Sequence, residues 1–295
     1  MNKFALFYRL LEKYELIYVF THQYPDSDAL NSQLALIAFV QDNYPEKTVS
    51  AVISENQELA SWGFGVILDC SNAGRVVGVN YKMLEETLLI DHHPNSEQFC
   101  NYSILDEKAA ATGEILTELF LSRENIVSAT TAQYLYQSIV GDSLNFTIAA
   151  TSAKTLLLAA ELLKKGADVS LAQDKLFHYR ENEFNFLTAL RSIASNDGGL
   201  LHLRLSKEDV ADFNVSMDFA KEGIKEFQSL SSAKIIALFY ENDNGLYNCS
   251  LRSKDIVINE VAEQFGGGGH RFASGVKDLL PPQEKELLRA LKKLL

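Results

Sequence analysis

The stretch YVFTHQYPDSDALNSQLALIAF, residues 18–39, joins a short apolar run to a polar loop and then to a helical pattern. Apolar residues recur with helical spacing over residues 29–41. A strand that leads directly into a helix is typical of a βαβ unit. The loop contains three side chains that can bind metal ions: His22, Asp26 and Asp28. The stretch therefore predicts an α/β fold with chemistry at the end of its first strand.

Further apolar runs along the chain resemble this first strand. They are short and continuous, as expected for strands that are buried on both faces: LIYVFTH (16–22), TVSAVIS (48–54), FGVILDC (64–70) and TLLIDHH (87–93). Helical stretches between several of them indicate a mostly parallel sheet flanked by helices. Helices are also predicted over residues 109–121, 128–140 and 151–168.

A second, smaller α+β domain is predicted after a helical linker. Residues 171–195 have a helical pattern rich in charged and amide side chains, and SNDGG follows at 195–199. A strand, a helix and two strands joined by a hairpin turn at Asp243-Asn244-Gly245 come next. We therefore divide the chain into a catalytic domain (1–170), a linker (171–199) and a second domain (200–295).

Composition excludes several classes of protein. The chain has 295 residues and a net charge of −12, which argues against binding of long duplex nucleic acid, because such binding needs many Lys and Arg contacts to phosphates. Its three cysteines form no C-x-x-C pair, so neither a disulfide framework nor a thiolate zinc site is expected. The N-terminal segment is interrupted by charged residues, which indicates an amphipathic helix rather than a signal peptide or membrane span. We expect a cytoplasmic protein.

The predicted strands share acidic or histidine residues at their C-terminal ends. After the first strand come His22, Asp26 and Asp28, the third contains Asp69, and the fourth is followed by Asp91, His92 and His93. Parallel sheets bind ligands at this edge, so these side chains are expected to converge. Histidine nitrogen with carboxylate oxygen suits Mn²⁺ or a similar divalent ion. For the first loop alone, a helix N-cap at Asp28 with a satisfied histidine explains the pattern equally well.

Four segments resemble, in order, the metal-site motifs of the DHH phosphoesterases: HQYPDSD (22–28), VILDCSNAGR (66–75), IDHHPNS (90–96) and SIVGDSLNF (138–146). SLRSKDIVINEVAEQFGGGGHRFASG (250–275) resembles the signature of their C-terminal substrate-binding domain. The resemblance covers almost the whole chain. It is closest to the small members that degrade nanoRNA and dephosphorylate 3′-phosphoadenosine 5′-phosphate (pAp), and enzymes that act on cyclic dinucleotides share the same two domains.

The resemblance implies a site with two Mn²⁺ ions, or Mg²⁺ or Co²⁺ in their place, which suits phosphoryl transfer. His22, Asp26 and Asp69 would hold one ion, and Asp28, Asp69, His92 and Asp142 the other. Asp91 would orient a ligating histidine, and His93 would act on the phosphate or leaving group as a hydrogen-bond donor or general acid. The fourth motif departs from the family pattern, because Leu144 stands where T-D-T-G-x-F has glycine. This change puts substrate preference and rate in doubt more than metal binding.

The second domain is expected to bind the substrate. Glycines at 266–269 leave backbone N–H groups accessible to an anion, and a flexible linker is the alternative interpretation of this glycine run. The HRFA segment after the glycines is predicted to open a short helix, whose N-terminus favours negative charge. The expected substrate-binding residues are Arg252, Ser253, Gly267, Gly268, Gly269 and His270, with Arg75 in the first domain as a weaker candidate. Arg252 can bind a phosphate through two hydrogen bonds, although a surface salt bridge would also explain it.

The sequence thus predicts a Mn²⁺-dependent phosphohydrolase that acts on short RNA oligonucleotides, on pAp, or on both. Hinge closure at the linker is expected to complete the site. A cyclic-di-AMP or linear dinucleotide (pApA) phosphodiesterase and a nucleotide-binding regulator with weakened catalysis are the alternatives. No membrane partner is expected, and the sequence is compatible with a homodimer.

Overall fold

The computed structural model describes residues 2–94 and 97–295 and divides into two compact units. The first unit extends to His178, and the second comprises Tyr179–Leu295. Each unit is described by itself below. In the described part of the chain, no helix combines the length and apolar character needed to cross a membrane.

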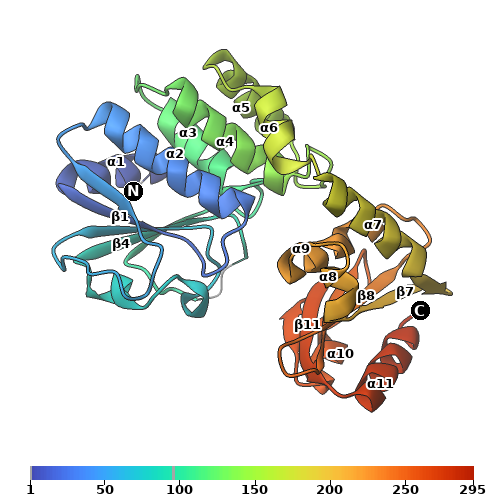
Figure 1. Ribbon diagram of the computed structural model, residues 1–295. Coiled ribbons are helices and arrows are strands. Elements are labelled where there is room, and N and C mark those ends of the chain that lie inside the picture. Colours follow the sequence, from blue (N-terminus) through green and yellow to red (C-terminus); the bar gives the residue numbers. More distant parts are fainter. Residues whose placement is uncertain (1, 95–96) are drawn as a thin grey trace. The chain divides into compact units, whose positions relative to one another are not determined.

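The first unit contains a five-stranded parallel sheet with the order β2-β1-β3-β4-β5 (Figure 1). Its strands are β1 (Leu16–Phe20), β2 (Thr48–Ala51), β3 (Phe64–Leu68), β4 (Glu86–Asp91) and β5 (Tyr102–Leu105). The predicted parallel sheet is confirmed. The short edge strand β5 was not among the sequence-based predictions, because its alternately exposed residues lack the continuous apolar character of the other strands.

Helices cover one face of this sheet, and short 3-10 helices and loops cover the other. The helices are α1 (Lys3–Lys13), α2 (Ser27–Asn43), α3 (Thr112–Leu121), α4 (Ala129–Asp142), α5 (Ala153–Lys164) and α6 (Val169–Leu176), with 3-10 helices η1 (Ala73–Arg75) and η2 (Asn80–Met83). Side chains of β1 alternate between the two faces, as the strand period requires. Ile17 and Val19 pack with the helices, whereas Tyr18 and Phe20 pack with Val76 and its neighbours near η1 and η2.

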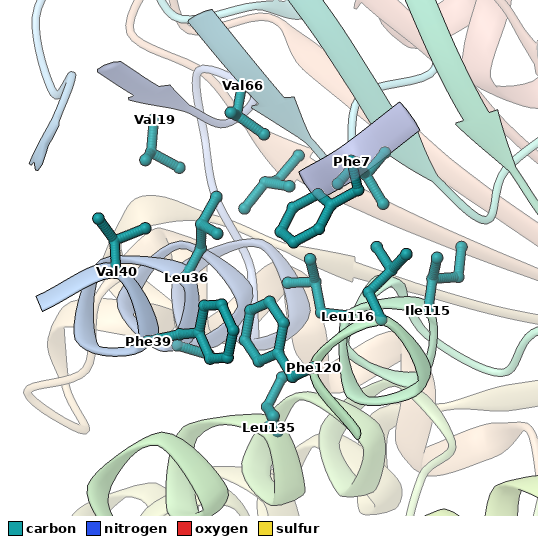
Figure 2. Packing of buried hydrophobic residues seen from close by; sticks show 14 of the residues in the cluster. Phe7, Val19, Leu36, Phe39, Val40, Val66, Ile115, Leu116, Phe120 and Leu135 are labelled. Carbon is teal, nitrogen blue, oxygen red and sulfur yellow. The ribbon is translucent and has the colours of Figure 1, made fainter. Parts of the chain in front are cut away.

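The main core of the first unit lies between the sheet and the helices (Figure 2). Phe39 of α2 stacks on Phe120 of α3 with ring centroids 3.8 Å apart. Phe7 of α1 and Leu135 of α4 belong to the same buried cluster. Apolar burial contributes about 25 cal/mol per Å². The cluster therefore holds the helices against the sheet, including those that start at its C-terminal edge.

The second unit contains a six-stranded mixed sheet with the order β10-β11-β9-β8-β7-β6. Its strands are β6 (Ser195–Asp197), β7 (Leu200–Leu205), β8 (Ile235–Glu241), β9 (Tyr247–Ser253), β10 (Gly268–His270) and β11 (Ala273–Leu279). Strands β7 and β8 are parallel, and the other pairs are antiparallel. The helices are α7 (Glu181–Ile193), α8 (Lys207–Ala211), α9 (Met217–Glu222), α10 (Asn259–Gln264) and α11 (Pro281–Lys292), with the 3-10 helix η3 (Gly223–Phe227).

Two features of the second unit bear on the sequence-based predictions. The hairpin turn at Asp243-Asn244-Gly245 is confirmed, since β8 and β9 are antiparallel and Gly245 has φ +73°. The short helix predicted at HRFA is wrong, because residues 268–270 and 273–279 form the antiparallel pair β10–β11. Residues 271 and 272 form the turn between these strands, and the pairing of His270 with Ala273 decides the structure of this segment.

Candidate metal centre

The predicted ligands come together at the C-terminal edge of the parallel sheet. Among the residues that the structure describes, three groups of side chains offer atoms that lie within 4.8 Å of one another. They are His22, Asp26 and Asp69; Asp28, His92 and Asp142; and Asp69, His92 and His93. The first two groups, with Asp69 added to the second, are the sets that the sequence analysis assigns to two ions. That assignment stays a prediction.

His92 is oriented as a ligand for a cation. Its Nδ1 lies 3.2 Å from the Ala109 carbonyl oxygen, which can only accept, so Nδ1 donates this hydrogen bond and Nε2 is the nitrogen left for a ligand. Nε2 is buried and has no hydrogen-bond partner among the described residues. It nevertheless faces Asp142 Oδ2 at 3.3 Å, Asp69 Oδ1 at 3.6 Å and Asp28 Oδ2 at 3.7 Å. The three carboxylate oxygens repel one another when charged, and a cation among them would remove this repulsion.

Asp28 is fully buried and accepts hydrogen bonds from three helices. Its Oδ2 accepts from the Thr112 N–H at 2.7 Å. Its Oδ1 accepts from the Gly113 N–H at 3.2 Å, from Ser32 Oγ at 3.1 Å and from Ser138 Oγ. Asp28 is therefore not the N-cap of its own helix. Asp26 occupies that position and accepts from the Ala29 N–H at 3.1 Å.

Asp69 occupies the centre of the cluster at the end of β3. Its φ of 55° is in the left-handed region, which aspartate tolerates better than branched residues do. Its Oδ2 lies 3.8 Å from His22 Nε2, and its Oδ1 lies 3.6 Å from His92 Nε2 and 3.3 Å from His93 Nδ1. Thr112 Oγ1 donates to the same Oδ1 at 3.1 Å. Asp69 therefore contacts both groups of predicted ligands.

His93 and Asp91 form a separate pair beside these ligands. Asp91 is 0% exposed, and its Oδ1 accepts from the His93 N–H at 3.1 Å and lies 2.9 Å from His93 Nδ1. Asp91, which the sequence predicts to orient a ligating histidine, thus contacts His93 instead of His92. Hydrogen bonds to Asp69 and Asp91 raise the pKa of His93 to about 10. His93 is therefore protonated at neutral pH and can donate to a phosphate.

Charge crowding favours a divalent cation at this edge of the sheet. Burial raises the pKa of Asp28, and the negative charges of Asp69 and Asp142 raise it further. Burial also raises the pKa of Asp142, to about 6. Burial acts to raise the pKa of Asp69, but the hydrogen bond from His93 and the neighbouring histidines lower it. Carboxylates that are this close and this buried are best neutralised by metal.

Three of the residues that position Asp28 were not identified from the sequence. Thr112 and Gly113 appear in the sequence only as parts of a helical pattern, and Ser138 opens the fourth motif, SIVGDSLNF, without being singled out. They reach Asp28 only because α3 and α4 pack beside it. The sequence does place serine, threonine and glycine on the buried faces of these helices. Such residues are common where helices pack, so they did not indicate hydrogen bonds to Asp28.

The altered fourth motif keeps Asp142 at the site. Leu144, Asn145 and Phe146 have φ of 47°, 59° and 65°, which is rare for consecutive residues other than glycine. Asn145 Oδ1 accepts from Gln173 of α6 at 3.0 Å, and Phe146 packs near Tyr136. These contacts stabilise the turn that follows Asp142. Asn95 and Ser96, the end of the IDHHPNS motif, lie outside the described residues.

Arg75 is the substrate-binding candidate in the first unit. Its carbonyl oxygen accepts from the Gln23 N–H at 2.8 Å, which places η1 beside the loop that carries His22. Burial lowers the pKa of His22, and the positive charge of Arg75 adds to this effect. The Arg75 side chain is exposed, so it is accessible to an anion at the rim of the site.

In the second unit, Arg252 and His270 lie in one row across three strands. Both are register partners of Ala273, Arg252 from β9 and His270 from β10, so their side chains share one face of the sheet. Arg252 is half-buried, and burial lowers its pKa. Its Nη1 donates to the Leu251 carbonyl oxygen at 2.9 Å, and no carboxylate of the described residues forms an ion pair with it. The surface salt bridge considered from sequence is therefore wrong.

Gly267 and Gly269 are explained by close packing against β11. A Cβ at Gly267 would lie 2.1 Å from the Gly275 carbonyl oxygen, and one at Gly269 would lie 2.6 Å from that of Ala273. Gly269 also has φ +137°. Gly268 has open space around it. Gly268 and Gly269 thus belong to strand β10 and not to a flexible linker. Ser253 Oγ donates to the Ile256 carbonyl oxygen at 2.5 Å.

Two family descriptions match this chain. Residues 16–139 match "DHH family, N-terminal domain", and residues 197–295 match "DHHA1 domain". Among solved structures, an exopolyphosphatase-related protein from Bacteroides fragilis has the same fold, with a TM-score of 0.86 at 20% identity over 100% of this chain and 99% of that chain.

Curated relatives extend over both units. A probable bifunctional oligoribonuclease and PAP phosphatase NrnA of Streptococcus mutans is 29% identical over 100% of both chains. The bifunctional oligoribonuclease and PAP phosphatase NrnA of Bacillus subtilis is 27% identical over 90% of both chains. The cyclic-di-AMP phosphodiesterase PdeA of Listeria monocytogenes is 25% identical over 96% of this chain and 48% of its own length.

Proposed function

Since this chain belongs to the DHH phosphoesterases and carries a DHH-family N-terminal domain and a DHHA1 domain, we propose that it is a Mn²⁺-dependent hydrolase of short oligoribonucleotides and pAp. One observation supports this most strongly: the buried Nε2 of His92, which forms no hydrogen bond with any described residue, faces three carboxylates at the edge of the sheet. The relatives named as oligoribonuclease and PAP phosphatase support the substrate class.

We assign the residues to two ions and to the phosphate. His22, Asp26 and Asp69 would hold one ion, and Asp28, Asp69, His92 and Asp142 the other. When bound, two divalent ions lower the pKa of water and neutralise charge on a phosphoryl group. His93, held by Asp91, would donate a hydrogen bond to the phosphate or a proton to the leaving oxygen.

The second unit would bind the nucleotide. Arg252 has no carboxylate partner among the described residues, and a half-buried guanidinium without an anion favours phosphate. His270 shares the same face of the sheet and would add a second donor. Long nucleic acid is bound through many Lys and Arg contacts to phosphates, which a protein of net charge −12 does not favour. A short nucleotide needs only a few such contacts.

A second candidate activity is hydrolysis of cyclic di-AMP or of linear pApA. The similarity to the cyclic-di-AMP phosphodiesterase of Listeria monocytogenes favours it. Both activities would use the same proposed metal centre. They differ in how the nucleotide must be held.

The test is a side-by-side assay of the purified full chain with Mn²⁺ against pAp, pApA, cyclic di-AMP and a five-nucleotide RNA. We expect the highest kcat/KM on pAp and the short RNA. Higher kcat/KM on pApA or cyclic di-AMP would establish the second candidate instead. Tight nucleotide binding without turnover on any of the four would identify a regulator.

A further inference from the structure

We propose that Thr112 is a positioning residue that fixes Asp28 and Asp69 relative to each other, and thereby the two proposed ion sites. This inference rests on the metal centre proposed above. It concerns a residue that is not itself among the predicted ligands and that contacts both of these buried carboxylates at once.

The two contacts of Thr112 come from atoms of one rigid residue. Its N–H donates to Asp28 Oδ2 at 2.7 Å, and its Oγ1 donates to Asp69 Oδ1 at 3.1 Å. Asp28 lies in the first turn of α2, whereas Asp69 follows β3, so different elements carry the two carboxylates. Thr112 is 0% exposed, and a β-branched side chain has few χ1 conformations. Both donors therefore have fixed positions.

The start of α3 explains why Thr112 lies there. The first N–H groups of a helix have no partner within the helix, and the N-cap Ala111 has no side-chain acceptor. Asp28 accepts from both Thr112 and Gly113 and so caps α3 from a different helix. The positive end of the helix in turn stabilises the buried carboxylate.

The hydroxyl group is the part of Thr112 that is specific to the centre. Capping of α3 needs only the backbone N–H, which every residue except proline provides. The Oγ1 hydrogen bond instead restricts rotation of the Asp69 carboxylate, whose other oxygen lies 3.8 Å from His22 Nε2. Loss of this hydroxyl would leave the fold and the cap intact but remove one of the hydrogen bonds that hold Asp69, so that His93 alone would hold this oxygen.

Three variants of the full chain separate positioning from folding. Thr112→Val removes the hydroxyl and keeps the shape, Thr112→Ser restores the hydroxyl, and Thr117→Val is the matched control. Thr117 is also on α3 and 0% exposed, but its Oγ1 donates to the Gly113 carbonyl oxygen at 2.6 Å and contacts no predicted ligand.

The measurement is titration of Mn²⁺ by calorimetry without substrate, together with the melting temperature in EDTA. We expect Thr112→Val to bind Mn²⁺ about 10- to 100-fold more weakly, as for other residues that orient metal ligands. Thr112→Ser and Thr117→Val should keep the wild-type affinity. The melting temperature in EDTA should fall no further for Thr112→Val than for Thr117→Val. If Thr112→Val does not fold, Thr112→Ala replaces it, and we expect the same weakening of Mn²⁺ binding.

Wild-type Mn²⁺ affinity in Thr112→Val, or an equal loss in Thr117→Val, would overturn the inference. Absence of Mn²⁺ binding by the wild-type protein would overturn it together with the proposed metal centre. Normal Mn²⁺ binding without hydrolysis of any nucleotide would overturn the proposed substrate only, and the affinities of the variants would still decide the role of Thr112.

Discussion

At the scale of single residues, adjacent histidines are held for different tasks. His92 donates from Nδ1 to the Ala109 carbonyl oxygen, which leaves Nε2 facing the carboxylates. His93 instead has its Nδ1 beside Asp91 and Asp69, and its side chain is 34% exposed. The first arrangement suits a metal ligand, and the second suits a donor that a substrate can reach.

The change His93→Ala tests this difference. We expect Mn²⁺ content to stay at the wild-type level, while kcat on pAp falls by roughly 100- to 10,000-fold, the usual contribution of an acid–base group. Metal analysis and steady-state kinetics measure the two effects. His178→Ala is the control, because His178 is exposed and pairs only with Asp174 among the described residues. Loss of Mn²⁺ from His93→Ala would show that His93 is a ligand.

At the scale of elements, the crossing of α3 and α4 determines the geometry at Asp28. A Cβ at Gly113 would lie 1.9 Å from Ser138 Oγ and 2.6 Å from Ser138 Cβ. Ser138 Oγ is also a donor to Asp28. The close approach of the two helices therefore needs glycine at position 113 and places a serine hydroxyl against the carboxylate.

Gly113→Ala should destabilise the protein, because Ser138 and α4 must move to admit the methyl group. We expect a loss of about 1 to 3 kcal/mol in the free energy of unfolding, typical of overpacked sites. Urea denaturation in EDTA measures it. Gly74→Ala is the control, since the nearest atom to its Cβ is Asn72 Oδ1 at 3.5 Å. Equal stability of the two variants would contradict the observed packing.

Sequence reasoning succeeded where a residue's position follows from its own element. His22, Asp69 and His92 follow parallel strands, whose ends share one edge of the sheet, so their convergence could be predicted. It failed where position depends on tertiary contacts. Asp26 and Asp28 are equally good N-caps locally, and only the packing of α3 against α2 decides between them. Strand β10 likewise forms only because β11 pairs with it.

At the scale of the whole molecule, the predicted residues are divided between two units. The predicted metal ligands lie in the first unit, and Arg252 and His270 lie in the second. Arg252 and His270 are far from the metal-centre residues in sequence. A kinetic effect of Arg252 on nucleotide substrates alone would therefore show that both units take part in catalysis.

Arg252→Ala should leave Mn²⁺ binding unchanged and lower kcat/KM for pAp and short RNA. Loss of a charge-assisted contact is typically about 1.5 to 3 kcal/mol, or roughly ten- to hundred-fold. Bis-p-nitrophenyl phosphate offers no nucleotide to bind, so its hydrolysis should hardly change. Equal loss on both kinds of substrate would show that Arg252 supports the fold or the metal centre, and unchanged kinetics would exclude it from substrate binding.

The central claim is that Asp69 joins two ion sites that together hydrolyse the substrate. The most direct test is to count bound Mn²⁺ per chain and to assay pAp hydrolysis in the same samples of wild-type protein and Asp69→Ala. We expect two Mn²⁺ ions and turnover in the wild type, and both a lower Mn²⁺ count and no turnover in the variant, because both sites lose a ligand. Wild-type Mn²⁺ content and turnover in Asp69→Ala would contradict the two-ion centre.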